Sequence, residues 1–201
     1  GKYLDNFSRE LEILKGNIYG VKVGLEMFTS EGPSSVEKLK KDGWTVFLDL
    51  KLHDIPNTVQ AAAISAGNIG ADYLTIHIAS GKEALLAAKE SKSENLKLLG
   101  VSTALTSKAY SPEISQKVYE EFLLAKESKI DGVICPPSEL VKTKELFELI
   151  VTPGIRLKND DSHDQKNITT PEKAIRDGAS YLVMGRSIRQ NINYVVEKLK
   201  L

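Results

Sequence analysis

The sequence has one cysteine, no net charge and no long hydrophobic run, and each absence excludes a class of protein. Cys135 alone cannot form a disulfide within the chain, which is typical of proteins in a reducing compartment. With 27 Lys and Arg against 27 Asp and Glu, the chain offers no general basic field for nucleic acid or a membrane surface. The apolar runs are far shorter than the roughly 18 to 20 residues that span a bilayer, and the N-terminal residues do not resemble a signal peptide. We therefore expect a cytoplasmic protein that binds neither nucleic acid nor membranes.

Low-complexity tracts and Gly/Ser linkers are also missing, so we expect a single domain over residues 1–201. Short apolar runs instead alternate with Lys/Glu-rich amphipathic segments along the whole chain. Short runs rich in β-branched residues are typical of strands buried on both faces, as in parallel sheets. The predicted strands are 19–24, 44–50, 71–79, 96–102, 131–135, 148–154 and 180–185, and the predicted helices are 31–42, 56–69, 80–91, 112–128, 137–147, 171–177 and 187–199.

This alternation predicts an α/β fold of the (β/α)8 TIM barrel type, small for its class. The seven strands, together with a short first strand at 1–4, make eight strand–helix units. An open doubly wound sheet is the structural alternative. The GxGxxG fingerprint that would favour a dinucleotide-binding version of that sheet is missing after the strands.

Unusual polar residues gather at the C-terminal ends of the predicted strands. In a barrel, this is the end at which active sites are built. The residues are Lys22 in the second strand, Asp49 and Lys51 at the end of the third, His77 late in the fourth, Thr106 after the fifth, Pro153 and Arg156 after the seventh, and Gly185 and Arg186 after the eighth.

The segment FLDLKLHDIPNT, residues 47–58, places charges inside an apolar strand. Strand alternation puts Asp49 and Lys51 on one face and the leucines on the other. Lys22, between two valines on a neighbouring strand, is expected to join them, with Asp54 as a fourth member. Because unpaired buried charges are costly, these groups form either a catalytic site or an ion network that only fixes strand register. For Asp54 alone, ending the strand or capping the next helix is the simpler interpretation.

Several motifs, in order along nearly the whole chain, resemble the orotidine 5'-monophosphate decarboxylase family in its bacterial form. The DxKxxD pattern by itself is shared with a wider suprafamily of phosphosugar enzymes. Joined to IPNT, PGIR and the later GR, it is much more specific. The motifs are KVGLEMF (22–28), FLDLKLHDIPNT (47–58), VTPGIR (151–156), DQK (164–166) and YLVMGRSI (181–188).

The resemblance implies decarboxylation of orotidine 5'-monophosphate to UMP, without metal or organic cofactor, in de novo pyrimidine biosynthesis. Lys51 matches the lysine that stabilises and protonates the C6 carbanion. Asp49 matches the carboxylate beside the substrate carboxylate, and Lys22 matches the lysine that bridges this aspartate and the ribose. Asp54, Ile55 and Thr58 match residues that reach into the partner subunit's site, which implies an obligate homodimer with two shared sites.

The resemblance also assigns residues to the rest of the substrate. Gly185, Arg186 and Gln165 match phosphate contacts, and Thr106 matches a residue that hydrogen-bonds the pyrimidine. Pro153 and Arg156 of PGIR are grouped with the substrate-binding residues. The polar segment 156–167 is expected to close over the bound phosphate, although its acids and histidine also allow a metal site.

The chain departs from the family at its start, where a first strand usually ends in ALD and its aspartate binds ribose. Here GKYLDN leaves little room for a strand, so Asp5 is only a candidate for that aspartate. If the strand is absent, we expect an open seam between predicted strands two and eight.

Two other functions stay open at this point. One is a metal-dependent suprafamily relative, such as a 3-keto-gulonate 6-phosphate decarboxylase or a hexulose-phosphate synthase. The other is a non-catalytic protein that binds nucleoside monophosphates on the same barrel.

Overall fold

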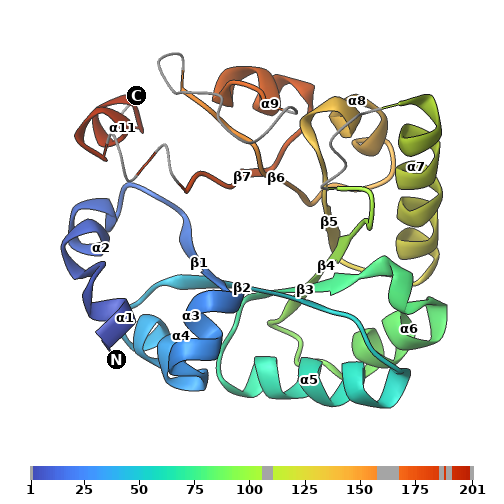
Figure 1. Cartoon of the computed structure of the whole chain (residues 1–201), viewed down its shortest axis with the longest axis horizontal. Coiled ribbons are helices and arrows are strands. Elements are labelled where there is room, and N and C mark those ends of the chain that lie inside the picture. The colour runs from blue at the N-terminus through green and yellow to red at the C-terminus, as the bar shows by residue number, and fades with distance from the viewer. Residues whose placement is uncertain (1, 106–110, 158–167, 186–187, 189–191, 200–201) are drawn as a thin grey trace.

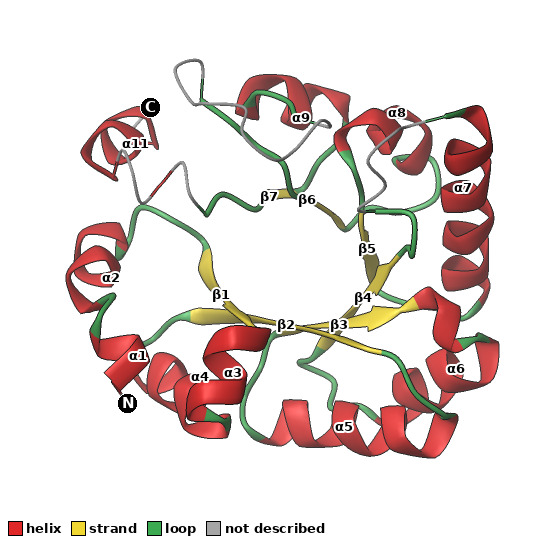
Figure 2. Ribbon diagram, viewed as in Figure 1, coloured by secondary structure: helices red, strands yellow, loops and turns green. Residues whose placement is uncertain are grey.

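A computed structural model of the chain describes residues 2–105, 111–157, 168–185, 188 and 192–199. Strands and helices alternate along it, which confirms the predicted α/β class (Figure 2). The strands are β1 (Gly20–Gly24), β2 (Thr45–Leu52), β3 (Tyr73–His77), β4 (Lys97–Val101), β5 (Gly132–Ile134), β6 (Ile150–Thr152) and β7 (Tyr181–Leu182). The helices are α1 (Lys2–Asp5), α2 (Ser8–Leu14), α3 (Leu25–Glu31), α4 (Pro33–Lys41), α5 (Pro56–Asn68), η1 (Ile78–Ser80), α6 (Lys82–Ser91), α7 (Pro112–Glu127), η2 (Pro137–Glu139), α8 (Leu140–Thr143), α9 (Pro171–Asp177) and α11 (Ile192–Leu199).

All seven strands are parallel and pair in chain order from β1 to β7. The sheet curls, and the helices lie around its outer side (Figure 1). This order is the one expected when each helix returns the chain to the start of the next parallel strand. Because the strands are parallel, the residues that follow them gather at one end of the curled sheet.

Alternate residues of each strand pack on opposite sides of the sheet. Val46 and Leu48 of β2 lie in the larger apolar cluster, which also contains residues of the outer helices. Phe47 of the same strand packs with a smaller cluster that includes Val101 of β4 and Val151 of β6. The side chains of Asp49 and Lys51 follow Phe47 in this alternation, so they belong to the inner side, as the sequence predicts.

The predicted first strand is wrong, because residues Lys2–Asp5 form the short helix α1. These residues contain no β-branched side chain that would favour a strand. Leu4 is buried in the larger cluster, and its backbone N–H donates to Glu31 of α3 at 3.0 Å. Among the described residues, β1 and β7 are the ends of the sheet, so the open seam expected for a missing first strand is present.

Aromatic side chains connect the two ends of the sheet. The ring of Tyr19, just before β1, stacks on Tyr181 of β7 with the ring centroids 4.4 Å apart. The hydroxyl groups of Tyr19 and Tyr73 lie 2.9 Å apart and share a hydrogen bond. Burial, followed by this hydrogen bond, raises the pKa of Tyr73, so its phenol stays neutral. On the outer side, α11 packs against α2 next to the same seam (Figure 1).

The strands β3, β5 and β7 each follow directly after a polar residue. The side chain of that residue accepts a hydrogen bond from a backbone N–H of the neighbouring strand β2, β4 or β6. Asp72, before β3, accepts from a backbone N–H of β2 at 2.7 Å. Asp131, before β5, accepts from β4 at 2.9 Å, and Ser180, before β7, accepts from β6 at 3.0 Å. These bonds pair N–H groups at the strand starts and fix adjacent strands relative to one another.

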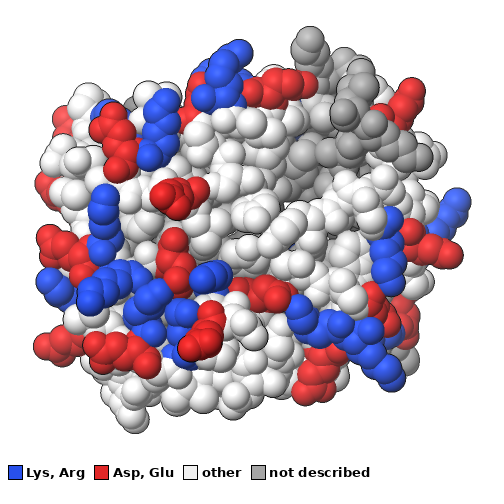
Figure 3. Space-filling model, turned by 180° about the vertical axis from the view of Figure 1, so that it is seen from behind, with Lys and Arg blue, Asp and Glu red and all other residues white. Residues whose placement is uncertain are grey.

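The charges on the surface are mixed in sign. On the face shown in Figure 3, Lys and Arg side chains are interspersed with Asp and Glu around the periphery, as expected from the zero net charge. No helix within the described ranges is long and apolar enough to cross a membrane.

We expect Asp131→Ala to lower the free energy of unfolding by about 2 kcal/mol, because it leaves the Leu98 N–H without its acceptor and removes the carboxylate 3.8 Å from the Lys92 ammonium. The control is Lys89→Met, which removes only the 2.6 Å ion pair with Asp131 and should cost about 0 to 1 kcal/mol. Urea denaturation of both variants measures the two losses. Equal losses would show that the ion pair, rather than the backbone hydrogen bond, makes Asp131 stabilising.

Candidate active site

Two lysines and one aspartate from adjacent strands form an ion-pair group on the inner side of the sheet. The carboxylate of Asp49 on β2 lies 3.2 Å from the ammonium of Lys22 on β1, through Oδ2. Its other oxygen, Oδ1, accepts a hydrogen bond from the Lys51 ammonium at 2.7 Å. The predicted alternation of charge across the two strands is therefore confirmed for these three residues.

The aspartate of this group is much more buried than the lysines. The side chain of Asp49 is 13% exposed, against 37% for Lys22 and 36% for Lys51. Burial by itself would raise the pKa of Asp49, but the hydrogen bond from Lys51 and the charges of both lysines outweigh it, so this pKa is held below its ordinary value. Asp49 is thus ionised at neutral pH, and both ammonium groups stay accessible to a ligand.

The backbone of β2 is irregular at Lys51, which the sequence did not indicate. The pairing with β3 shifts between Leu48 and Leu52, and Lys51 has φ of 51°, in the left-handed region. Its N–H donates to the hydroxyl of Thr75 on β3 at 2.8 Å. The same hydroxyl donates to Asp49 Oδ1 at 3.0 Å.

Thr75 is a residue of this group that sequence reasoning missed. It is fully buried between the apolar residues of β3, where a threonine is an ordinary strand former. The one available signal was its position: Thr75 and His77 share the inner face of the strand next to Asp49 and Lys51.

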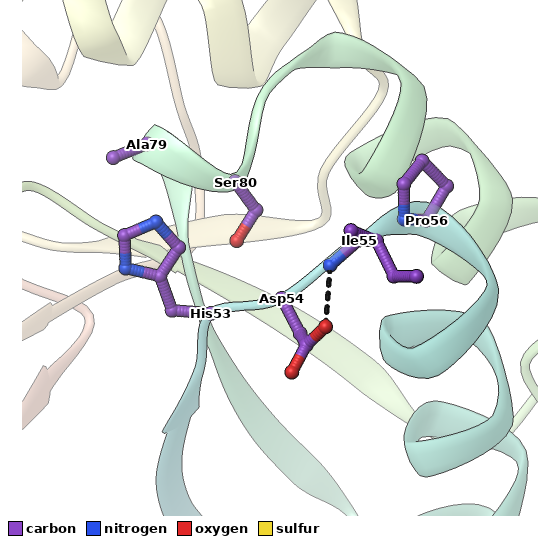
Figure 4. Close-up of a pocket in the computed structure, with 6 residues that line it drawn as sticks. All are labelled: His53, Asp54, Ile55, Pro56, Ala79 and Ser80. Atoms are coloured by element: carbon purple, nitrogen blue, oxygen red, sulfur yellow. Dashed lines mark hydrogen bonds between the residues drawn. The ribbon is translucent and has the colours of Figure 1, made fainter.

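Asp54 lies apart from the ion-pair group, in the segment that joins β2 to α5. Its Oδ1 accepts a hydrogen bond from the Ile55 N–H at 2.7 Å (Figure 4). The two residues line an open pocket of about 510 Å³, whose other lining residues are His53, Pro56, Ala79 and Ser80. Asp54 is exposed, and so is Thr58 in the first turn of α5. The sequence predicts Asp54 as a fourth member of the group formed by Lys22, Asp49 and Lys51. Among the described residues of this one chain, Asp54 makes no contact with those three charges.

Two histidines lie beside each other near this pocket. The rings of His53 and His77 have centroids 5.4 Å apart. Burial and then the neighbouring His53 lower the pKa of His77, so its imidazole is neutral at physiological pH. The buried Nδ1 of His77 has no hydrogen-bond partner within the described part of the chain.

The residues after β6 and β7 lie where the sequence predicts. Pro153 follows β6 directly, and Gly154 adopts a positive φ of 78° that favours glycine. Arg156 donates its backbone N–H to Thr169 at 3.0 Å, which holds the PGIR segment against residues before α9. Gly185 is exposed, and a Cβ built on it would meet no atom of the described residues within 4 Å.

Asp5 is not brought to the site. It lies on α1, and its carboxylate pairs with Lys38 of α4 at 2.6 Å, among the helices outside the sheet. This position follows from the helix that replaces the predicted first strand. Thr106, Gln165 and Arg186 lie outside the described residues, as does most of the segment 156–167. In the ranges that the structure describes, no group of three or more His, Cys, Asp or Glu side chains is arranged to hold a metal ion.

We expect Asp49→Asn to destabilise the protein near neutral pH, because two ammonium groups lose the carboxylate between them. The folded-state pKa of Asp49 is lowered, so its stabilisation is complete above the unfolded-state pKa of about 3.8 and is lost as the pH falls through the folded-state pKa. The difference in unfolding free energy between wild type and variant should therefore shrink as the pH falls below about 3.8. Denaturation across this pH range measures it, and a constant difference would contradict the assignment.

Known proteins match this chain over nearly its whole length. Residues 4–199 match the model of the family described as "Orotidine 5'-phosphate decarboxylase / HUMPS family". The orotidine 5'-phosphate decarboxylase of Fusobacterium nucleatum is 40% identical over 210 aligned positions, which cover 96% of this chain and 84% of that protein. The protein of the same name from Nitrosomonas europaea is 43% identical over 191 positions, covering 89% and 82%.

A solved structure agrees with the sequence matches. The crystal structure of orotidine 5'-phosphate decarboxylase from Lactobacillus acidophilus superposes with a TM-score of 0.75 at 31% identity, covering 96% of this chain and 92% of that one. These matches establish that the chain, with its ion-pair group on the inner side of β1 and β2, belongs to the orotidine 5'-phosphate decarboxylase / HUMPS family.

Proposed function

We propose that this protein decarboxylates orotidine 5'-monophosphate to UMP in pyrimidine biosynthesis. The observation that carries the proposal is the ionised Asp49, held between the ammonium groups of Lys22 and Lys51 at the inner side of adjacent parallel strands. Relatives about 40% identical over most of the chain carry the name of this enzyme. As a carboxy-lyase, the enzyme breaks one C–C bond and replaces it with a C–H bond.

The chemistry requires positive charge at a fixed place. Loss of CO2 from C6 leaves an electron pair in the plane of the pyrimidine, which the ring cannot delocalise. An ammonium group held beside C6 stabilises this charge and then supplies the proton that completes UMP. Lys51 is our candidate, because its ammonium is held by Asp49 while its side chain as a whole is still 36% exposed. A preorganised cation of this kind acts without reorganising during the reaction.

Asp49 has two effects in this proposal. Its negative charge orients the two lysines, and it lies close to the carboxylate of the bound substrate. Two like charges about 4 Å apart repel by about 4 kcal/mol at an effective dielectric constant of about 20, and the repulsion falls as CO2 departs. Lys22, on the other side of Asp49, is then free to contact the ribose hydroxyl groups.

The phosphate supplies binding energy away from the reacting carbon. We assign it to the backbone at Gly185 together with Arg186 and Gln165, and we place Pro153 and Arg156 in the same pocket. Thr106 contacts the pyrimidine. Interactions at this remote end raise the rate only if they help to hold C6 at Lys51, which requires the strand ends to be rigid.

The same proposal includes a homodimer with shared sites. Ile55 is 65% exposed, although it is a large apolar side chain beside Asp54 at the start of α5. The exposure of Ile55 leaves its side chain available for a partner subunit to cover. We propose that Asp54, Ile55 and Thr58 of each subunit complete the partner's site.

The finer fold assignment is also a proposal: one domain of the small (β/α)8 barrel type, open among the described residues at the seam where the predicted first strand is missing, and located in the cytoplasm. The curled seven-stranded sheet supports the barrel, since its strands follow the order of such a barrel. The family description also covers the HUMPS enzymes. A metal-dependent reaction of that branch is the rival function, and a chelator separates the two.

We expect the purified protein to consume orotidylate at the same rate with and without a chelator. Lys51→Ala should lower kcat by on the order of 10³-fold or more, because it removes both the charge and the proton donor. Lys173→Ala is the control, since this lysine pairs with Asp177 on α9 and should leave kcat unchanged. The decrease in orotidylate absorbance gives the rates. Chelator-sensitive turnover, or UMP binding without turnover by folded protein, would contradict the proposal.

The shared site predicts complementation between two inactive variants. Lys51→Ala and Asp54→Asn should each be inactive alone, but a mixed dimer contains one site with an intact Lys51 and an intact Asp54. Random mixing of the two subunits in a two-fold dimer should then restore about a quarter of wild-type activity. The mixture is unfolded and refolded together before the assay, and each variant treated alone is the control. No recovery from a mixture that forms dimers would refute the sharing of sites.

A further inference from the structure

The hydroxyl group of Thr75 connects two parts of the ion-pair group. Thr75 lies on β3 with its side chain fully buried, next to the irregular part of β2. Its Oγ1 accepts from the Lys51 N–H at 2.8 Å and donates to Asp49 Oδ1 at 3.0 Å. One side chain therefore holds both the backbone of Lys51 and the carboxylate that the Lys51 ammonium contacts.

The direction of these hydrogen bonds is fixed. Asp49 is ionised, so its oxygens only accept, and the Thr75 proton must point toward Oδ1. The lone pairs of the same hydroxyl then face the Lys51 N–H, which can only donate. The Lys51 ammonium also donates to Oδ1, at 2.7 Å. The three hydrogen bonds therefore form a closed ring that runs from the Lys51 N–H through the Thr75 hydroxyl and Asp49 Oδ1 back to the Lys51 side chain.

The ring compensates for the break in the sheet. Between Leu48 and Leu52 the regular pairing of β2 with β3 is interrupted, and Lys51 adopts a backbone conformation that lysine rarely takes. Such conformations persist only where surrounding contacts determine them. Thr75 supplies such a contact, since its hydroxyl accepts from the N–H of that residue.

We infer that Thr75 is a positioning residue, whose hydroxyl sets the backbone of Lys51 and the carboxylate of Asp49 so that the Lys51 ammonium is presented to the reacting carbon. This inference rests on the proposed decarboxylase function. It assigns no contact between Thr75 and the substrate, because Thr75 is fully buried and both of its bonds go to protein groups.

The test compares three variants. Thr75→Val keeps the shape of the side chain and removes the hydroxyl, and Thr75→Ser keeps the hydroxyl. Thr152→Val is the matched control, because Thr152 is another fully buried strand threonine, and its hydroxyl has no partner among the described residues. If Thr75→Val does not fold, Thr75→Ala replaces it, since it removes the hydroxyl without placing a methyl group there.

We expect Thr75→Val to lower kcat by roughly 10- to 100-fold, as a displaced catalytic group does, while the dissociation constant of UMP changes by less than about threefold. Thr75→Ser and Thr152→Val should stay within about threefold of wild type in both quantities. An unchanged kcat in Thr75→Val, or equal losses in Thr75→Val and Thr75→Ser, would overturn the inference. So would a loss of UMP affinity as large as the loss of kcat, because that result indicates general damage to the site.

The pH dependence of kcat/KM is a second measurement. It should not change on substitution if Thr75 only stabilises the fold. The groups facing Asp49 are Lys22 from β1, Lys51 from its own strand and Thr75 from β3. Removing the Thr75 donor should raise the pKa of Asp49, so the acid limb of kcat/KM should move to higher pH in Thr75→Val and stay in place in Thr75→Ser. Identical acid limbs would count against the role of Thr75.

Failure of the proposed function is seen separately, in the wild-type protein. If wild type does not decarboxylate orotidylate, the function is wrong whatever Thr75 does. Crystal structures of wild type and Thr75→Val then decide the structural step of the inference. Loss of the left-handed Lys51 conformation or of its contact with Asp49 in the variant supports it, and an unchanged Lys51 overturns it.

Discussion

The ionised carboxylate of Asp49 is the interaction on which the site depends. It accepts from Lys51 through one oxygen and pairs with Lys22 through the other. Without this negative charge, two ammonium groups from neighbouring strands would repel each other across the inner side of the sheet. Parallel pairing makes the arrangement possible, because it brings the same ends of β1, β2 and β3 together and points alternate side chains inward.

The ion-pair group buries its anion and leaves its cations partly exposed. Burying a carboxylate is costly, and the cost is offset here only because two cations and one hydroxyl surround it. Both lysine side chains are more than a third exposed. Exposed cations around a buried anion leave positive charge facing the space above the strands, where a negatively charged ligand is attracted.

Periodicity predicted most of the fold, because buried parallel strands and amphipathic helices have distinct patterns. The predicted helices at 56–69 and 171–177 agree closely with α5 and α9, each of which begins at a proline. Strand alternation also placed Lys22, Asp49 and Lys51 on one face. The predicted strand at 1–4 was wrong, because the chain forms α1 there and Leu4 packs in the larger apolar cluster. A segment of four residues has too little pattern to distinguish a helix from a strand.

The irregular backbone at Lys51 and the hydrogen bonds of Thr75 were not predictable from the sequence. Both depend on how β2 pairs with β3, which local sequence does not specify. A threonine in an apolar strand is unremarkable until the neighbouring strand loses its register and presents an N–H that needs an acceptor. The hydrogen bond of Thr75 to Lys51 therefore depends on tertiary structure, and it can be recognised only once β2 and β3 are placed side by side.

The position of Lys22 depends on the seam of the sheet. Lys22 lies on β1, which pairs with β2 on one side and, among the described residues, with no strand on the other. An edge strand held by one ladder alone would be expected to shift more easily than a central strand. Tyr19, directly before β1, restrains it by stacking on Tyr181 and by its hydrogen bond to Tyr73. The tyrosines thus hold the start of the strand whose central residue is Lys22, so the aromatic packing before β1 and the position of the Lys22 charge are linked through β1.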